Sequence, residues 1–257
     1  MNYPRLGSSL AAISFALLVP CLALSHGAEA EEKTAHVEDE GDEAHPAAGH
    51  HDLVHPFMAH MGMPDGPGEV SLRVTSIQER NGPDAAGTYA FHIEAGVADR
   101  LGLHLRNDGV GKHESTEMML QYAVLRSASG SDGLAVIGEL EFPTGPAAEN
   151  RSRGLFGLSF AVTPAPILKI DSVVHYGPEE KMIEWEIAFV SRLTKKIFPT
   201  LEFRGESSKD MSLTNSLLAF KFKVTPQNTI GVAYQIPITS MREYDSQLLM
   251  QAEFNFD

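Results

Sequence analysis

Residues 247–256, QLLMQAEFNF, alternate between apolar and polar side chains. The apolar face carries Leu248, Met250, Ala252, Phe254 and Phe256, and the polar face carries Gln247, Gln251, Glu253 and Asn255. A period of two residues indicates a β-strand with two unlike faces. The pattern recurs at 89–95, 101–106, 183–189 and 220–224, so the chain is predicted to be all-β.

Twelve segments after residue 68 carry this strand pattern. The predicted strands are 69–79, 87–97, 100–107, 116–127, 133–142, 152–163, 166–176, 182–193, 197–206, 213–224, 228–237 and 247–256. Mostly short connections follow the even-numbered strands, whereas longer polar ones, such as 80–86 and 143–151, follow the odd-numbered strands. Short turns at one end and long loops at the other are typical of an up-and-down antiparallel barrel in an outer membrane.

The length of the predicted strands favours a membrane location. Most are long enough to span a bilayer when tilted, which takes about nine to eleven residues, whereas strands of globular proteins average about five or six. Phe254 and Phe256 are similar to the C-terminal signal for outer-membrane insertion, although the chain ends in Asp257. We expect a transmembrane β-barrel of about 12 strands. Alternation alone also fits a soluble β-sandwich, which stays the alternative.

The composition of the chain argues against several classes of function. Of its 257 residues, 34 are acidic and 20 basic, for a net charge of −14, and nucleic-acid binding requires a basic surface. Cys21 is the only cysteine, so an internal disulfide and a cysteine-rich metal site are excluded. The sequence has no P-loop, HExxH, nucleophile elbow or dinucleotide fingerprint. We therefore expect no enzymatic activity.

Residues 1–25 have the layout of a secretory signal peptide. Arg5 precedes an apolar run from Leu10 to Val19, and a proline and small residues follow. Small residues at positions −3 and −1 allow cleavage after Ser25 or after Ala30. The apolar run is too short for a comfortable membrane-spanning helix, so the protein is predicted to be exported.

Residues 26–68 form an acidic tail with ten acidic residues, one lysine and seven of the eleven histidines of the chain. This tail has few large apolar side chains, so it is predicted to be disordered and to precede a barrel over 69–257. Imidazoles together with thioethers favour copper, with zinc or nickel as alternatives. The candidate metal ligands are His50, His51, His55, Met58, His60, Met61 and Met63. A solvated spacer that binds no metal is the other interpretation.

The polar faces of the predicted strands would line the barrel lumen. Candidate functional residues there are His92, Glu94, His104, Glu139, Glu141, His175, Glu184 and Glu186. Carboxylates in a narrow, low-dielectric space attract cations. The same side chains can instead pair across a small barrel and fill it. His92, His104 and His175 either form a second metal site or belong to that hydrogen-bonded network.

Residues 138–145, GELEFPTG, run from a predicted strand into a Pro-Thr-Gly turn, and 116–126 form the preceding strand. This stretch resembles the outer-membrane transporters associated with the phenol meta-cleavage (MetA) pathway. The resemblance covers the barrel region, 69–257, and leaves out the tail. It implies an exported barrel with a role in transport.

These patterns together predict an outer-membrane barrel of transporter type in a Gram-negative bacterium, handling solutes or metal ions in the envelope. Its expected partners are the lipid bilayer, metal cations and a periplasmic metal-handling protein that receives metal from the tail. The barrel itself is expected to require no cofactor. The alternative is a soluble periplasmic metal-binding β-sandwich protein.

Overall fold

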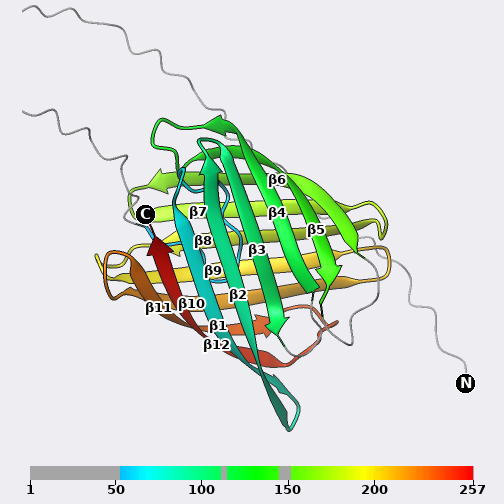
Figure 1. Ribbon diagram of the computed structural model, residues 1–257. Coiled ribbons are helices and arrows are strands. Elements are labelled where there is room, and N and C mark those ends of the chain that lie inside the picture. Colours follow the sequence, from blue (N-terminus) through cyan, green and yellow to red (C-terminus); the bar gives the residue numbers. More distant parts are fainter. Residues whose placement is uncertain (1–52, 111–114, 145–151, 257) are drawn as a thin grey trace, which may run out of the picture. The chain divides into compact units, whose positions relative to one another are not determined.

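The computed structural model describes residues 53–110, 115–144 and 152–256, and in this part the chain forms twelve β-strands (Figure 1). They are β1 (Val70–Asn81), β2 (Asp84–Ala98), β3 (Leu101–Val110), β4 (Ser115–Arg126), β5 (Gly133–Pro143), β6 (Arg153–Ala165), β7 (Leu168–Gly177), β8 (Met182–Ser191), β9 (Ile197–Ser207), β10 (Ser212–Lys223), β11 (Asn228–Pro237) and β12 (Ser246–Phe256). The alternating pattern therefore located every one of these strands to within three residues at each end.

The sheet closes on itself. Each strand pairs antiparallel with the strands before and after it in sequence, and β12 pairs with β1 in a register that runs from Val70↔Phe256 to Arg80↔Ser246. Closure leaves no strand edge with unpaired backbone groups. The predicted up-and-down antiparallel barrel is confirmed, and the sandwich alternative is wrong.

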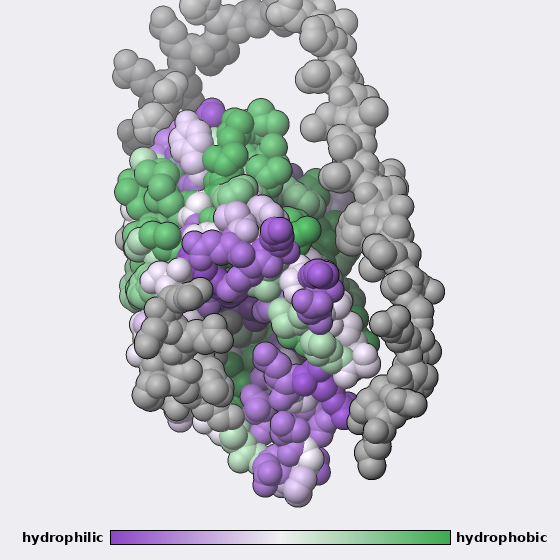
Figure 2. All heavy atoms as spheres, turned by 90° about the vertical axis from the view of Figure 1, so that its right-hand side faces the viewer, coloured by the Kyte–Doolittle hydropathy of each residue, from purple (hydrophilic) through white to green (hydrophobic). Residues whose placement is uncertain are grey.

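Apolar side chains cover the outside of the barrel. Leu120 and Leu158, near the middle of β4 and β6, are 50% and 51% exposed. Other exposed apolar residues lie around the wall, including Val136, Phe156, Val174, Leu218, Phe220, Val232 and Met250. Figure 2 shows such residues over the outer wall, beside a hydrophilic patch. This arrangement exposes the apolar face of each strand and encloses the polar face, as lipid surroundings require. Among the described residues, no helix is long and apolar enough to cross a membrane.

The strand connections differ between the two ends of the barrel. The even-numbered strands lead into the short-turn end, where the connections include residues 99–100 and 166–167 and where β1 begins and β12 ends. The odd-numbered strands lead into the long-loop end, which has the two longest connections, 144–152 and 238–245. In outer-membrane barrels, short turns face the periplasm and longer loops face the outside.

One connection differs from its prediction. The sequence suggested a longer polar loop over residues 80–86, but β1 and β2 continue as a hairpin to a two-residue turn at Gly82 and Pro83. Gly82 has a φ of 59°, a left-handed conformation that glycine adopts without strain. Figure 1 shows this hairpin projecting beyond the neighbouring strands.

Residues 53–68 lie inside the barrel as a plug segment, which forms neither helix nor strand. Leu53 lies by a cavity at the short-turn end, and Met58 reaches a second cavity at the long-loop end. The segment then returns, and the Gly68 N–H donates to the Gly96 carbonyl at the short-turn end, at 2.8 Å. The plug segment is therefore a loop inserted from the short-turn end.

The predicted disorder is wrong for residues 53–68. That prediction considered the segment alone, because a polar segment with few large apolar side chains cannot become ordered without other parts of the chain. The barrel wall supplies what the segment lacks, so that Phe57 is fully buried and Met63 is 2% exposed. The rest of the predicted tail, residues 26–52, and the predicted signal peptide lie outside the described residues.

Candidate functional site in the barrel lumen

Carboxylates from three neighbouring strands hold backbone N–H groups of the plug segment. Glu202 on β9 accepts hydrogen bonds from the N–H groups of Phe57, Met58 and Ala59, the latter two at 2.9 and 3.0 Å. Because these three residues are buried, each of their N–H groups needs a partner of this kind. One carboxylate thus satisfies three consecutive donors, an arrangement that backbone amides commonly offer to anions.

Two further carboxylates continue this row around the wall. Glu186 on β8 accepts the His60 N–H at 2.8 Å and lies 2.9 Å from His60 Nδ1. Asp171 on β7 accepts the Gly62 N–H at 2.9 Å. Strands β7, β8 and β9 therefore fix the path of the plug segment through its backbone donors.

Basic and amide side chains donate to the carbonyl groups of the plug segment. Arg73 Nη1 on β1 donates to the Pro56 and Ala59 carbonyls at 3.0 and 3.2 Å. Lys221 Nζ on β10 donates to Pro56 at 3.3 Å and to His55 at 3.0 Å. Amide nitrogens complete the set, from Gln121 to Met61 at 3.1 Å and from Gln251 to Phe57 at 2.6 Å. Apart from the backbone bond of Gly68 to Gly96, the plug segment is thus held mainly by side chains.

Apolar contacts also hold the plug segment against the wall. Phe57 packs in a buried cluster that includes Leu217, Ala219, Ala233 and Leu249 on the wall. Nearer the short-turn end, the buried Met63 packs against the small wall residues Ala123, Ala135 and Ala161. These alanines leave the space that the plug segment occupies, because larger inward side chains would fill it.

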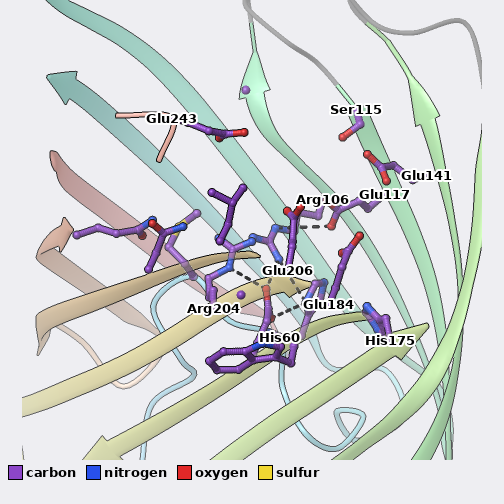
Figure 3. Close-up of a pocket in the computed structure, with 18 of the residues that line it drawn as sticks. His60, Arg106, Ser115, Glu117, Glu141, His175, Glu184, Arg204, Glu206 and Glu243 are labelled. Carbon is purple, nitrogen blue, oxygen red and sulfur yellow. Dashed lines mark hydrogen bonds and ion pairs between the residues drawn. The ribbon is translucent and has the colours of Figure 1, made fainter. Parts of the chain in front are cut away.

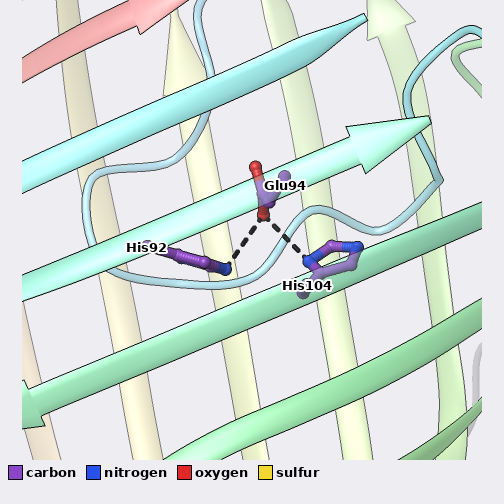
Figure 4. Close-up of side chains that lie close together, drawn as sticks. All are labelled: His92, Glu94 and His104. Carbon is purple, nitrogen blue, oxygen red and sulfur yellow. Dashed lines mark ion pairs between the residues drawn. The ribbon is translucent and has the colours of Figure 1, made fainter. Parts of the chain in front are cut away.

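Three imidazoles lie around that of His60 at the middle of the barrel. The His60 ring centroid is 5.0 Å from that of His92, 5.9 Å from that of His104 and 6.2 Å from that of His175. Glu94 Oε1 is 3.3 Å from His92 Nε2 and 3.2 Å from His104 Nδ1 (Figure 4). All three residues of this triad are at most 6% exposed.

Hydrogen bonds fix the tautomer of His104. Gln121 Nε2 donates to the Met61 carbonyl and to Ser159 Oγ, so its Oε1 faces His104 Nε2 at 3.1 Å. Nε2 must therefore carry the ring proton that it donates. In the neutral imidazole, Nδ1 then presents a lone pair towards Glu94.

The cavity at the long-loop end, of about 370 Å³, is strongly acidic (Figure 3). We call it the long-loop vestibule. Three arginines line it, Arg106, Arg153 and Arg204, against eight carboxylates: Glu79, Glu117, Glu139, Glu141, Glu184, Glu186, Glu206 and Glu243. Carboxylates therefore outnumber guanidinium groups by more than two to one.

The arginines of the long-loop vestibule are already engaged. Arg106 Nη1 and Arg204 Nε lie 3.2 and 2.9 Å from Glu186 Oε1. Arg153 pairs with Glu141 and, at 3.2 Å, with Glu184. The cations in the wall are thus shared among the carboxylates, and the vestibule keeps an excess of negative groups facing the cavity.

The cavity at the short-turn end, of about 550 Å³, has a balanced lining. Its acidic residues are Asp65, Glu69 and Glu253, and its basic residues are Arg126, Lys169 and Lys223. His55 also lines it, with Nδ1 3.0 Å from Glu253 Oε1 and Nε2 3.8 Å from Asp65 Oδ1. Burial lowers the pKa of His55, but the neighbouring carboxylates outweigh burial, so the pKa is raised from its ordinary value.

The eight lumen residues expected from the sequence all project inward. His92, Glu94 and His104 form the central triad, and the long-loop vestibule takes Glu139, Glu141, His175, Glu184 and Glu186. Arg73 and Glu117 were not among the residues singled out from the sequence. Arg73 could have been found, because residues 70–75, VSLRVT, alternate and place it on the polar face.

The seven tail residues expected to bind metal do not form one site among the described residues. His50 and His51 lie outside the described part of the chain. His55 lines the short-turn cavity, whereas His60 reaches the long-loop vestibule. The thioethers of Met58 and Met63 pack in separate apolar clusters, and Met61 is 4% exposed. The wall thus fixes these residues apart, because their backbone and side chains are bound to different strands.

The strand that carries the family resemblance ends at the rim of the long-loop vestibule. Pro143 closes β5, and the Thr144 hydroxyl accepts hydrogen bonds from Thr116 at 3.1 Å and from Asn107 at 3.3 Å. Residue 145 lies outside the described residues. The Pro-Thr pair therefore links β5 to β4 and β3 at this rim.

Comparison by sequence finds no relative: no family model matches the chain, and no curated protein matches it. Comparison by structure does. The KdgM porin has a TM-score of 0.56 at 10% identity, covering 73% of this chain and 99% of that chain. The COG4313 outer membrane channel from Pseudomonas putida F1 has a TM-score of 0.55 at 10% identity, covering 76% and 97%. The NanC porin has a TM-score of 0.53 at 9% identity, covering 73% and 99%.

At these identities the likeness concerns the fold. The chain has the twelve-strand barrel of outer-membrane channels and porins. A closed barrel with a continuous apolar outer face spans an outer membrane, so the protein is located in the outer membrane of a Gram-negative bacterium. The periplasmic alternative is wrong for the same reason.

Proposed function

We propose that this protein is an outer-membrane channel for small solutes, with a preference for cations, in which the plug segment restricts flow. The observation that carries the proposal is the acidic long-loop vestibule above the plug segment. Long loops of outer-membrane barrels face the outside, so this vestibule meets the medium first. An excess of carboxylates between low-dielectric walls concentrates cations there.

Ion flow through the barrel depends on how firmly the plug segment is held. It lies between the two cavities. Side chains of at least seven strands form hydrogen bonds with it: β1, β4, β7, β8, β9, β10 and β12. We expect a small conductance from the native protein and a larger one from variants in which the plug segment is loosened. Absence of conductance in both would contradict a channel.

Ion selectivity tests the charge argument. Purified protein in planar lipid bilayers under a salt gradient should give a reversal potential on the cation side. Replacing Glu117→Gln and Glu243→Gln together removes two vestibule carboxylates and should shift that potential towards zero. Glu179→Gln is the matched control, because Glu179 is exposed in the turn after β7 and does not line the vestibule. An unchanged potential in the double variant would count against the cation preference.

Two finer roles rest on the sequence alone. Transport of the solutes handled by the phenol meta-cleavage type of transporter is supported by GELEFPTG at residues 138–145. Metal capture by the tail, with copper, zinc or nickel and delivery to a periplasmic partner, is supported by the histidines within residues 26–52. Growth of a deletion strain on phenolic substrates and under copper or zinc stress would test both roles.

A further inference from the structure

We propose that the middle of the barrel holds a divalent transition-metal ion, with His92, Glu94 and His104 as ligands and His60 of the plug segment as the fourth. This site shares only His60 with the candidate metal ligands of the tail and does not depend on the channel function. Its wall residues come from one hairpin. Positions 92 and 94 are on the same face of β2, and the β2–β3 register places Glu94 directly opposite His104.

The distances fit tetrahedral coordination. Bonds of about 2.0–2.1 Å to a tetrahedral Zn²⁺ place neighbouring ligand atoms about 3.3 Å apart. Glu94 Oε1 lies 3.3 Å from His92 Nε2 and 3.2 Å from His104 Nδ1 (Figure 4). The three ligand atoms all lie within 4.8 Å of one another. Only small adjustments are needed for them to meet one ion.

Unpaired ring nitrogens provide a second, independent observation. Four buried imidazole nitrogens in this cluster make no hydrogen bond of normal geometry: His60 Nε2, His92 Nε2, His104 Nδ1 and His175 Nε2. Two of them, His92 Nε2 and His104 Nδ1, lie 3.3 and 3.2 Å from Glu94 Oε1. A buried polar atom without a hydrogen bond is unfavourable, and a metal ion bound by His60, His92 and His104 would satisfy the first three. The ring centroid of His60 lies 5.0 Å from that of His92 and 5.9 Å from that of His104, so this imidazole can supply the fourth ligand.

The surrounding hydrogen bonds support two of the three imidazoles as ligands. Metal-binding histidines usually donate their other ring N–H to an oxygen acceptor. His104 does so to Gln121 Oε1 at 3.1 Å, and His60 Nδ1 lies 2.9 Å from Glu186 Oε2. His92 differs, because Arg73 Nη2 lies 2.6 Å from its Nδ1. Binding a metal ion through Nε2 places the ring proton on Nδ1, which can then no longer accept from Arg73. Arg73 Nη2 must therefore donate to Glu94 alone.

The donor set indicates the class of metal. Three imidazoles and one carboxylate suit Zn²⁺ or a neighbouring divalent ion, and do not offer the six or more oxygens that Ca²⁺ requires. Because His60 belongs to the plug segment and the other ligands to the wall, the ion would fasten one to the other. Bound metal should therefore slow any movement of the plug segment.

Zinc binding can be measured on the full chain in detergent. To exclude the tail, the parent protein carries Gln in place of its histidines at 26, 36, 45, 50 and 51. After dialysis against Zn²⁺, elemental analysis should find one Zn²⁺ per chain. Glu94→Gln and His104→Gln should each weaken zinc binding at least tenfold, roughly the smallest effect seen for residues around metal sites. His175→Gln is the matched control and should bind zinc as the parent does, because His175 is also buried but lies outside the triad.

A second variant covers the case in which those replacements unfold the barrel. His104→Cys supplies a thiolate ligand, so its complex with Co²⁺ should show a thiolate-to-cobalt absorption band that the parent lacks. Folding of every variant is checked by the shift in gel migration on boiling. The proposal is overturned if the parent binds no Zn²⁺, if folded Glu94→Gln binds it unchanged, or if folded His104→Cys lacks the band. None of these outcomes involves conductance.

Discussion

Single residues in the lumen show how closely the plug segment approaches the wall. A Cβ atom at Gly62 would lie 2.0 Å from the carbonyl oxygen of Phe160, which belongs to the backbone of β6 and cannot turn aside. Gly231 on β11 meets the Phe57 ring in a similar way, since a Cβ there would be 2.7 Å from Phe57 Cε2. Glycine is required at both positions because the plug segment and the barrel wall are in direct contact there.

Gly62→Ala should loosen the plug segment and raise the conductance in planar bilayers. The added methyl group clashes with backbone, so the plug segment must move away from β6. Gly138→Ala is the control, because Gly138 has no atom within 4 Å of the position that its Cβ would take. Equal conductance of Gly62→Ala and the native protein would argue against the plug segment as the restriction.

The chemistry of the lumen was only partly predictable from the sequence at this scale. Alternation placed His92 and Glu94 on one polar face, because side chains two apart in a strand share a face. The sequence did not indicate that His104 would oppose Glu94, since this depends on the register between β2 and β3. Nor did it bring in His60, whose position follows from bonds to Glu186, 126 residues away.

At the scale of elements, the plug segment depends on the strand wall for its conformation. Residues 53–68 contain neither the two-residue nor the 3.6-residue apolar period, so nothing in the segment itself predicts its path. The strands, in contrast, were predictable because each carries its own alternating pattern. Glu202 is the clearest case of the long-range dependence, since its carboxylate organises three residues that are about 145 positions away.

Glu202→Gln should release the first part of the plug segment. An amide has one acceptor oxygen, and its NH₂ group would face backbone donors, so at least one buried N–H loses its partner at a cost of about 1–3 kcal/mol. Amide hydrogen exchange at Phe57, Met58 and Ala59 should become roughly ten- to a hundredfold faster.

Thr200→Val is the control for this measurement. Thr200 lies two residues earlier on β9 and is 1% exposed, yet its hydroxyl has no hydrogen-bond partner. Its replacement should leave exchange in the plug segment unchanged. Similar exchange rates in Glu202→Gln and the native protein would contradict the role assigned to this carboxylate.

At the scale of the whole molecule, the outer apolar belt determines where the barrel is stable. Leu120 lies at the middle of β4 and faces outward. An arginine there would face the bilayer midplane, so Leu120→Arg should lower the free energy of unfolding in lipid vesicles by roughly 2–4 kcal/mol. Val124→Arg, on the same face but near the short-turn end, should cost less, roughly 0–1 kcal/mol. Equal effects at the two positions would contradict a membrane-spanning β4.

The route of the plug segment also has a topological consequence for assembly. Its residues precede every strand in the chain, yet all twelve strands surround them once β12 has joined β1. Because the segment enters and leaves through the same end of the barrel, no part of it is threaded through the ring. A loop of this kind can be inserted before or after the barrel closes, and it can be withdrawn without separating a single pair of strands.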